Sequence, residues 1–388
     1  MGKSMIAALW SKIIERLKSY NYRHINFRML IWLYALLILG LNVIASATRE
    51  TTYETKQLFG IIVGSCVMLV LLFIDYHFVL KFYWLIYLFN LLLLLAVKFV
   101  GENNKGAQRW LNVGPVQLQP SEFAKIFLVL FFAKLMWKYK DKFNKPKILA
   151  LFIITFVIPL LLVFKQPDLS TSIVIVVSFC VMLYIGGLSY KIIAGVFAVA
   201  VPSAVILIYI LMQPDQTLLD SYQVDRLLGF FDEDNEVAER INYQQTNSLI
   251  AIGSGGVWGK GLNNDREDSV KNGNYISEAQ TDFIFTIVGE ELGFVGTMTV
   301  IILISLISFE CFYMGAHAPD LAGRIICCGI GAIIAFQSFV NMSVATKLLP
   351  NTGLPLPFVS YGLSSLLSLM IGMGVVMNVG LQHKKLLS

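Results

Sequence analysis

The stretch EAQTDFIFTIVGEELGFVG runs from Glu278 to Gly296 and, after Glu278, places three acidic residues in an apolar run. Asp282 stands near its start, and Glu290 and Glu291 follow deeper inside. A charged side chain at the centre of a membrane helix costs about 2.5–3.5 kcal/mol on insertion scales, so such residues are rarely idle. A carboxylate at the membrane edge can accept a substrate proton, which makes Asp282 a candidate general base. A purely structural role as a helix cap is the alternative.

Glu290 and Glu291 lie about 12–13 Å further along the expected helix than Asp282, at a rise of 1.5 Å per residue. Adjacent helical residues point roughly 100° apart, so one can face a cavity while the other pairs with a neighbouring helix. The alternative is that both make structural pairs. In either case we expect them to shape the cavity or the helix packing around it.

The candidate cations are Lys125 and Arg109. Lys125 follows Glu122 by three positions, so the two can pair on one helix face, and the simplest interpretation is a self-neutralising surface pair. However, Lys125 also opens the apolar run IFLVLFFA, where an unpaired ammonium is costly. Arg109 stands beside Trp110 and suits either bidentate phosphate contact or anchoring at the headgroups.

Two further segments interrupt the apolar pattern. Asp168 begins a predicted span, where it is either a functional carboxylate or a helix cap. Residues 347–365 contain three prolines and thus an irregular backbone, which a membrane tolerates only when it is buried in protein or lines a wet cavity. Together these residues predict an outward-facing pocket with cations for phosphate and a carboxylate for proton abstraction.

Several familiar chemistries are excluded. GSGGVWGKG lacks the glycine and the Ser/Thr that a P-loop requires at Ser254 and Gly261. Ser121 and Lys125 are four positions apart, whereas an acyl-enzyme S-x-x-K motif needs three. The four histidines are scattered, so a histidine metal cage is not expected.

The composition is that of an integral membrane protein. Of 388 residues, 56% are hydrophobic and 14% charged, and the mean hydropathy is +0.69, whereas soluble domains are about 25% charged. The sequence predicts an all-α, polytopic integral membrane protein, with a basic cytoplasmic segment at 1–26 and a single transmembrane domain at 27–388. Windows of about 20 apolar residues predict ten spans, at 27–47, 58–75, 79–99, 122–137, 147–164, 168–187, 191–212, 282–309, 323–346 and 358–380.

The Lys and Arg distribution sets the orientation of these helices. Six basic residues lie in the first 28 positions, and five lysines lie at 138–147. We expect both segments, and hence the N-terminus, in the cytoplasm, so that the long 213–281 loop faces outward. That loop holds twelve acidic and five basic residues. The net charge of +5 reflects this asymmetry and does not indicate nucleic-acid binding.

Four outward-facing segments carry a family resemblance. They contain GAQRW with QPSEFAK, QPDL, QTDFIF with GEELG, and LPNTGLPLPFVSYG. Together they resemble the SEDS family, the polytopic RodA, FtsW and SpoVE proteins of bacteria, from the first predicted span to the last. QTDFIF and GAQRWLNVG are more similar to the RodA branch, which serves elongation, than to the FtsW branch, which serves division.

The resemblance implies a peptidoglycan glycosyltransferase in the bacterial plasma membrane. Such an enzyme polymerises lipid II into β-1,4-linked glycan and releases undecaprenyl diphosphate, together with a class B penicillin-binding protein. It also implies that Asp282 is the essential residue. Lys125 and Arg109 are then the expected cations for the diphosphate, followed by Arg226 in the outer loop. The remaining residues expected to bind substrate are Glu122, Asp168 and Ser360.

Some alternatives stay open. A divalent cation, Mg²⁺ or Mn²⁺, is an optional bridge between the phosphates and Asp282. A flippase for lipid-linked precursors would need access to both membrane sides, often with inverted repeats, and the sequence has no internal repeat. A scaffold that only binds the penicillin-binding protein would not need Asp282 or Lys125. A division or sporulation polymerase is a further alternative within the family.

The predicted topology can be tested with single cysteines at Asn235 and Lys142. An impermeant thiol reagent applied to intact cells should label position 235 and leave position 142 unlabelled, because only the 213–281 loop is expected outside. The unsubstituted chain, with its own five cysteines, gives the background. Labelling at position 142 would overturn the topology.

Overall fold

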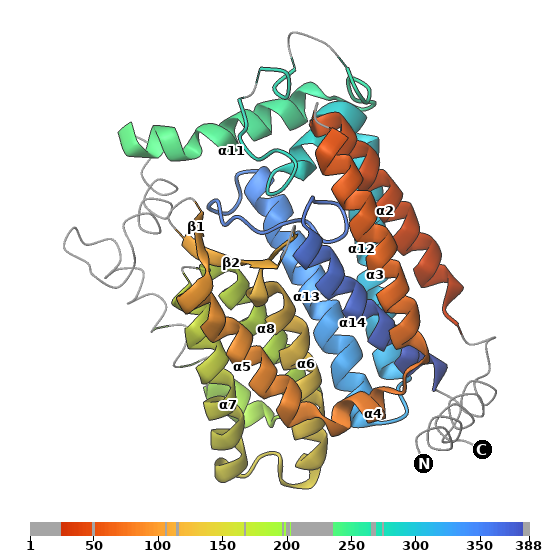
Figure 1. Ribbon diagram of the computed structural model, residues 1–388, viewed down its shortest axis with the longest axis vertical. Helices are drawn as coiled ribbons and strands as arrows, with labels where there is room; N and C mark the ends of the chain where they lie inside the picture. Colours follow the sequence, from red (N-terminus) through yellow and green to blue (C-terminus); the bar gives the residue numbers. More distant parts are fainter. Residues whose placement is uncertain are drawn as a thin grey trace.

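The computed structural model describes residues 25–48, 51–104, 107–113, 116–166, 168–195, 236–264, 269–273 and 275–382, with two isolated positions at 198 and 202. These residues form a bundle of helices with little strand (Figure 1). The helices are α2 (Phe27–Ala47), α3 (Thr51–Phe73), α4 (Tyr76–Lys81), α5 (Tyr83–Val100), α6 (Pro120–Lys138), α7 (Pro146–Phe164), α8 (Leu169–Ile185), α11 (Glu236–Ser254), α12 (Ile284–Ala316), α13 (Leu321–Ala345) and α14 (Leu363–Leu381), with a 3-10 turn, η2, at Lys140–Lys142.

The prediction of an all-α, polytopic membrane protein is confirmed. Within the described residues, seven helices are long and apolar enough to cross a membrane, and α6 and α8 run alongside them (Figure 1). These nine helices match nine of the ten predicted spans, with α4 forming an elbow before α5. Most of the tenth predicted span, 191–212, lies outside the described residues, as does nearly all of the 1–26 segment.

The core of the bundle is built on α13 and α14. In each of these two helices 78% of the most apolar stretch is buried in protein, against 22% for α5 at the periphery. Small residues let the neighbours of α13 come close. A Cβ added at Gly329 would meet Val129 of α6 at 3.0 Å, and one at Gly331 would meet Cys311 of α12 at 3.0 Å. This close packing brings Lys125 of α6 and Ser178 of α8 within hydrogen-bond distance of α13.

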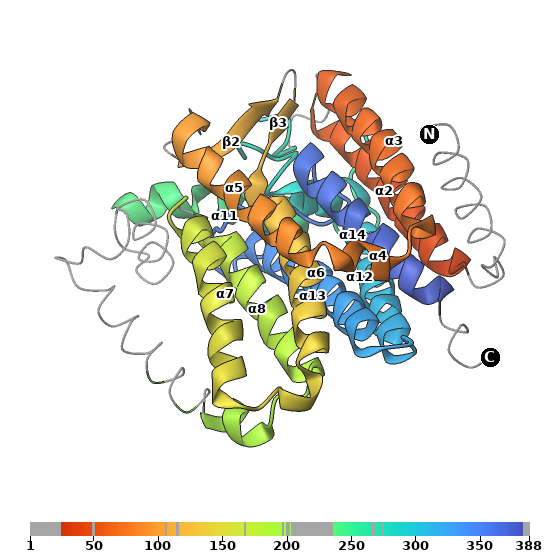
Figure 2. The same ribbon diagram turned by 60° about the horizontal axis from the view of Figure 1, so that its bottom comes forward.

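A small antiparallel sheet covers one end of the helices, where the sequence predicted only a loop. It has the order β1 (Glu102–Asn104), β2 (Ala107–Val113), β3 (Val116–Leu118). Figure 2 shows β2 and β3 at this end, where β2 contacts α5 and α6 and β3 contacts α14. The strands are only three to seven residues long, too short for a clear alternating pattern.

Helix α11 is the second element that the sequence did not predict, since the whole 213–281 segment was expected to be a loop. It lies across the end of the bundle (Figure 1). Its buried face is polar: Gln245 Nε2 donates to the carbonyls of Val344 (2.9 Å) and Leu349 (2.8 Å), and Ser248 Oγ donates to Ala345 O (2.7 Å). A helix that buries polar residues lacks the apolar periodicity by which amphipathic helices are found.

A charged cluster around His77 lies at the opposite end of the bundle. Its Nδ1 lies 2.9 Å from Asp75 Oδ1, and its Nε2 lies 2.7 Å from Asp320 Oδ2. The hydrogen bonds to Asp320 and Asp75 raise the pKa of His77 to about 9, so the ring is positively charged at neutral pH. Asp320 also accepts from Gly323 N (2.7 Å) and caps α13. The cluster ties the α4 elbow to the start of α13.

Helix α12 is broken, although the sequence predicted one continuous span over 282–309. The break is at Gly293, where φ is +64° and ψ is −157°, a conformation open essentially only to glycine. A Cβ there would also meet the backbone nitrogen of Gly259 at 2.4 Å. The first part of α12 is therefore a separate short rod, with Asp282 just before it.

Substitution of this glycine should be destabilising. Gly293→Ala is expected to lower the free energy of unfolding by about 1–3 kcal/mol from backbone strain alone, with a further loss from the clash. The matched control is Gly253→Ala in α11, where a Cβ meets nothing within 4 Å and helix propensity favours alanine by up to about 1 kcal/mol. Thermal unfolding of both variants in detergent measures the difference, and equal midpoints would contradict the role of Gly293.

Candidate active site

Asp282 lies in a turn that is anchored through its backbone. The turn precedes α12, whose N-cap position falls on Phe283. The main-chain carbonyl of Asp282 accepts a hydrogen bond from Asn341 Nδ2 (2.8 Å), and the carbonyl of Thr281 accepts from Ser360 Oγ (2.6 Å). The Asp282 residue is half-buried, whereas Phe283 and the residues that follow it are buried. The carboxylate is thus attached to a fixed backbone at the edge of the buried region.

The irregular segment 350–362 forms the wall beside this turn. Its backbone carbonyls find side-chain partners inside the protein: Asn341 Nδ2 donates to Leu354 O (2.7 Å) and Gln337 Nε2 to Pro355 O (2.8 Å). Phe358 has a φ of +64°, a strained value for a bulky residue and one that is concentrated at functional sites. Of the two alternatives expected for this irregular backbone, burial in protein holds for residues 356–360, and the partners named here satisfy two of its carbonyls.

Lys125 and Glu122 form a buried ion pair, rather than the surface pair that their spacing suggested. Both carboxylate oxygens of Glu122 lie 2.9 Å from Lys125 Nζ, which also donates to Gln337 Oε1 (2.7 Å). The Lys125 side chain is 0% exposed and that of Glu122 is 2% exposed. The pair is buried because α6 packs against α13 at this point. The ammonium therefore supports the site from within the protein.

Asp168 is the N-cap of α8 and also a link to α6. Its side chain accepts from Thr171 N (3.3 Å), Ser121 Oγ (2.9 Å) and Gln119 Nε2 (3.2 Å), and the residue is 3% exposed. The bond from Thr171 caps α8, and the bonds from Ser121 and Gln119 hold the start of α8 against the start of α6. The bond from Ser121 also joins Asp168 to the residue that precedes Glu122 on α6.

Arg109 comes to the same region from the sheet. It lies on β2, and its Nε donates to the carbonyl of Gln166 at 3.1 Å, two residues before Asp168. The residue is half-buried. The planar guanidinium is suited to bidentate contact with a phosphate.

Hydrogen bonds to α13 join the Lys125–Glu122 pair and the Asp282 turn, and Ser360 donates to that turn. Asp168 is bonded to α6 through Ser121, and Arg109 is bonded to Gln166, two residues before Asp168. Arg226 lies outside the described residues. The connecting residues were missed by the sequence analysis: Gln337 and Asn341 of α13, both buried. A signal existed, because two amides four positions apart lie on one face of an apolar helix, where polar side chains are costly and often functional.

The family model described as a cell cycle protein, FTSW_RODA_SPOVE, matches residues 24–385. The chain belongs to this family. The peptidoglycan glycosyltransferase MrdB of Escherichia coli K12 is 34% identical over 367 residues, which cover 94% of this chain and 95% of the relative. A probable peptidoglycan glycosyltransferase FtsW of Haemophilus influenzae is 32% identical over 390 residues, covering 97% and 94%.

Two solved structures have a similar fold. The rod shape determining protein RodA of Thermus thermophilus superposes with a TM-score of 0.66 at 25% identity, covering 95% of this chain and 98% of that one. A chain from a structure described as a peptidoglycan synthase complex that coordinates polymerization and crosslinking superposes with a TM-score of 0.76 at 26% identity, covering 95% and 98%. The RodA-like prediction is confirmed.

The buried pair on α6 should obey the rule for buried ion pairs. Lys125→Met leaves the Glu122 carboxylate buried without its cation and is expected to cost about 3–5 kcal/mol of stability. The double variant Lys125→Met/Glu122→Gln removes both charges and should recover most of that loss. Thermal unfolding of the three proteins in one detergent measures it. A single variant as stable as the parent protein would show that the pair does not hold α6 to α13.

Proposed function

We propose that this protein is a peptidoglycan glycosyltransferase of the RodA type, which polymerises lipid II into β-1,4-linked glycan and releases undecaprenyl diphosphate. Its relatives MrdB and FtsW are named peptidoglycan glycosyltransferases, and the similarity to them covers 94% and 97% of this chain. The observation that carries the mechanism is the half-buried Asp282 on a turn whose two main-chain carbonyls are held by buried side chains.

In the proposed reaction, Asp282 accepts the proton of the acceptor sugar's 4-hydroxyl as that oxygen attacks the anomeric carbon of lipid II. The donor is an α-linked glycosyl diphosphate and the product is β-linked, so the displacement inverts. The diphosphate is a good leaving group and needs little acid assistance, so one carboxylate base is enough. A fixed backbone favours this role because a general base must lie within hydrogen-bond reach of the proton that it removes.

Charge that develops on the diphosphate needs cations nearby. We assign this role first to Arg109, whose guanidinium is half-buried and held at one nitrogen by Gln166 O. Arg226 is the second candidate. Lys125, whose ammonium is engaged by Glu122 and Gln337, would need to leave these partners to touch a phosphate, so we assign it a positive field at short range rather than direct contact.

Glu122, Asp168 and Ser360 are assigned supporting roles at the substrate site. Glu122 neutralises Lys125 and fixes it to α6, while Asp168 joins the start of α8 to Ser121 on α6. Ser360 is buried, and its hydroxyl both accepts from Leu356 N (2.7 Å) and donates to the Thr281 carbonyl. The Ser360 contacts hold the 350–362 wall to the Asp282 turn, and the Glu122 and Asp168 contacts fix residues of α6.

A divalent cation fits this proposal only as a partner of the substrate. Among the described residues, no three His, Cys, Asp or Glu side chains gather to hold an ion. Mg²⁺ is commonly held by one or two carboxylates together with substrate phosphates, and Asp282 offers one such carboxylate. When bound, the ion would neutralise charge on the diphosphate.

We further propose that the protein works with a class B penicillin-binding protein in the bacterial plasma membrane, with its N-terminus in the cytoplasm. A multi-pass membrane protein follows from the helices themselves. The partner is supported by the similar chain from a complex that couples polymerization with crosslinking. The orientation is supported by the lysines and arginines at 1–28 and 138–147.

Asp282→Asn should abolish polymerisation and leave folding intact. Asn matches Asp in size and capping ability, and the bonds that anchor this turn go to main-chain carbonyls. The amide cannot accept the proton, so the rate should fall by about 10²–10⁴-fold. The measurement is polymer formed from labelled lipid II by the purified variant with its penicillin-binding partner, beside its thermal midpoint.

The matched control is Glu278→Gln, which removes an exposed carboxylate four residues away and should keep activity. A stable Asp282→Asn protein that retains more than about a tenth of the parent rate is incompatible with loss of a general base. An inactive parent complex would instead refute the proposed function itself.

A further inference from the structure

The break in α12 is filled by the backbone of another segment. In an unbroken helix the carbonyls of Glu290 and Glu291 would accept from the amides four positions later. Here they accept from Lys260 N and Gly261 N, each at 2.9 Å. A loop more than twenty residues earlier in the chain thus replaces the missing turn of helix, which meets the need to satisfy every polar backbone group in a membrane.

The other side of the break is bonded to the same loop. Phe294 N donates to Gly256 O (2.9 Å) and Val295 N donates to Val257 O (3.2 Å). Four backbone hydrogen bonds therefore join α12 to residues 256–261, two on each side of Gly293. The loop and the two parts of α12 must move as one unit, because displacing either exposes four donors or acceptors.

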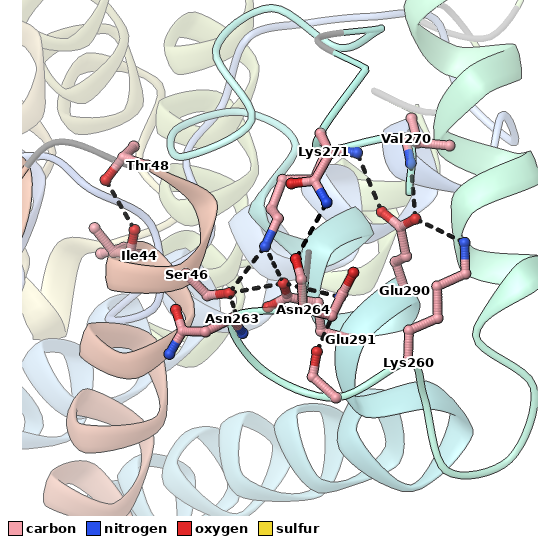
Figure 3. Close-up of polar contacts among 12 residues, drawn as sticks. Ile44, Ser46, Thr48, Lys260, Asn263, Asn264, Val270, Lys271, Glu290 and Glu291 are labelled. Atoms are coloured by element: carbon pink, nitrogen blue, oxygen red, sulfur yellow. Dashed lines mark hydrogen bonds and ion pairs between the residues drawn. The ribbon is translucent and has the colours of Figure 1, made fainter. Parts of the chain in front are cut away.

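The side chains of Glu290 and Glu291 repeat this connection with charge (Figure 3). Glu290 Oε1 lies 3.0 Å from Lys260 Nζ and 2.8 Å from Val270 N, and Glu291 Oε1 lies 2.6 Å from Lys271 Nζ. Both glutamate side chains are 0% exposed. The structural pairing expected of these two acids is thus what the fold adopts, with both lysine partners supplied by the segment before α12.

A residue of α2 completes the cluster. Ser46 Oγ donates to Glu291 Oε1 (2.7 Å) and accepts from Asn263 N (2.8 Å), while Asn264 Nδ2 lies 3.4 Å from the same carboxylate oxygen (Figure 3). Ser46 and Glu291 are 245 positions apart in the chain. Ser46 thus bonds α2 to both the loop and α12.

The short rod from Ile284 to Leu292 lies between this cluster and the candidate site. Nine residues at 1.5 Å each span about 13 Å. One end carries the two glutamates, and the other end follows Asp282, whose carbonyl is bound by Asn341. Residues 283–291 are all buried, so the rod is packed along its length. A shift or rotation at the glutamate end is therefore transmitted to Asp282.

We propose that Glu290 and Glu291, through Lys260 and Lys271, are positioning residues for the glycosyl transfer: they clamp the rod at the depth and rotation at which Asp282 meets the acceptor hydroxyl. This inference rests on the proposed function. It gives the two deeper acids a role that is separate from chemistry, since neither carboxylate needs to touch substrate. A misplacement of about 1 Å in a catalytic group can cost about 10²-fold in rate, so the clamp acts on kcat.

The test begins with Lys271→Met, which leaves the Glu291 carboxylate without its ammonium. In the full complex with the penicillin-binding partner, kcat for labelled lipid II should fall about 10- to 100-fold, while KM changes by less than about threefold because substrate contacts are kept. The exchanged pair Glu291→Lys/Lys271→Glu restores opposite charges and should recover part of the lost kcat, by the logic of a double-mutant cycle.

Hydrogen exchange of the peptide covering residues 281–292 provides a readout that does not need activity. Lys271→Met should raise exchange there, and the exchanged pair should lower it again. The matched control is Glu310→Gln, on α12 beyond the break and bonded to Asn26, which should change neither kcat nor exchange in 281–292.

The possible results separate the two proposals. Unchanged kcat in Lys271→Met overturns the positioning role, whatever the exchange result. A large rise in KM with constant kcat also overturns it, because it would mean lost substrate contact. If the parent complex makes no polymer, the proposed function fails, and unchanged exchange at 281–292 would then refute the clamp by itself.

Discussion

Two amide side chains on α13, Gln337 and Asn341, form the hydrogen bonds that connect the polar parts of the candidate site inside an apolar bundle. An unsatisfied polar group in such an interior costs several kcal/mol, and the side-chain nitrogen of each amide donates to a main-chain carbonyl. Gln337 binds the Lys125 ammonium and the backbone of the 350–362 segment, and Asn341 binds that segment and the Asp282 carbonyl. One helical stripe, about 6 Å along the axis, thus places the ion pair, the irregular wall and the Asp282 turn relative to one another.

The same requirement explains the irregular elements. The 350–362 segment and the break at Gly293 both leave polar backbone groups outside regular structure, and in each case other parts of the protein supply the partners. Buried charges follow the rule as well: each of Glu122, Glu290 and Glu291 has a lysine within 3.0 Å. Such pairs contribute little net stability but break at high cost, which suits a site that needs fixed geometry.

The distribution of these features along the bundle fits an enzyme better than a transporter. The candidate site lies at the end of the bundle with the sheet and α11, and α4 lies at the opposite end (Figure 1), where His77 bonds to Asp75 and Asp320. A transporter needs a site that opens alternately to both sides. A glycosyltransferase needs access from one side only, with a carboxylate and cations fixed there, as the family membership also indicates.

The sequence by itself determined the spans and the candidate residues. A run of about 20 apolar residues in lipid must be helical, because only a helix satisfies its own backbone, and the motifs around Asp282 and Lys125 were visible as interruptions of that pattern. The limits of α12, its break, the sheet and α11 were not visible, since short or polar-faced elements lack periodicity. Only the tertiary structure decided which charges are paired and buried. Gln337 lies 212 positions from Lys125, and Ser46 lies 245 from Glu291, so these partners depend on helix packing that no local pattern encodes.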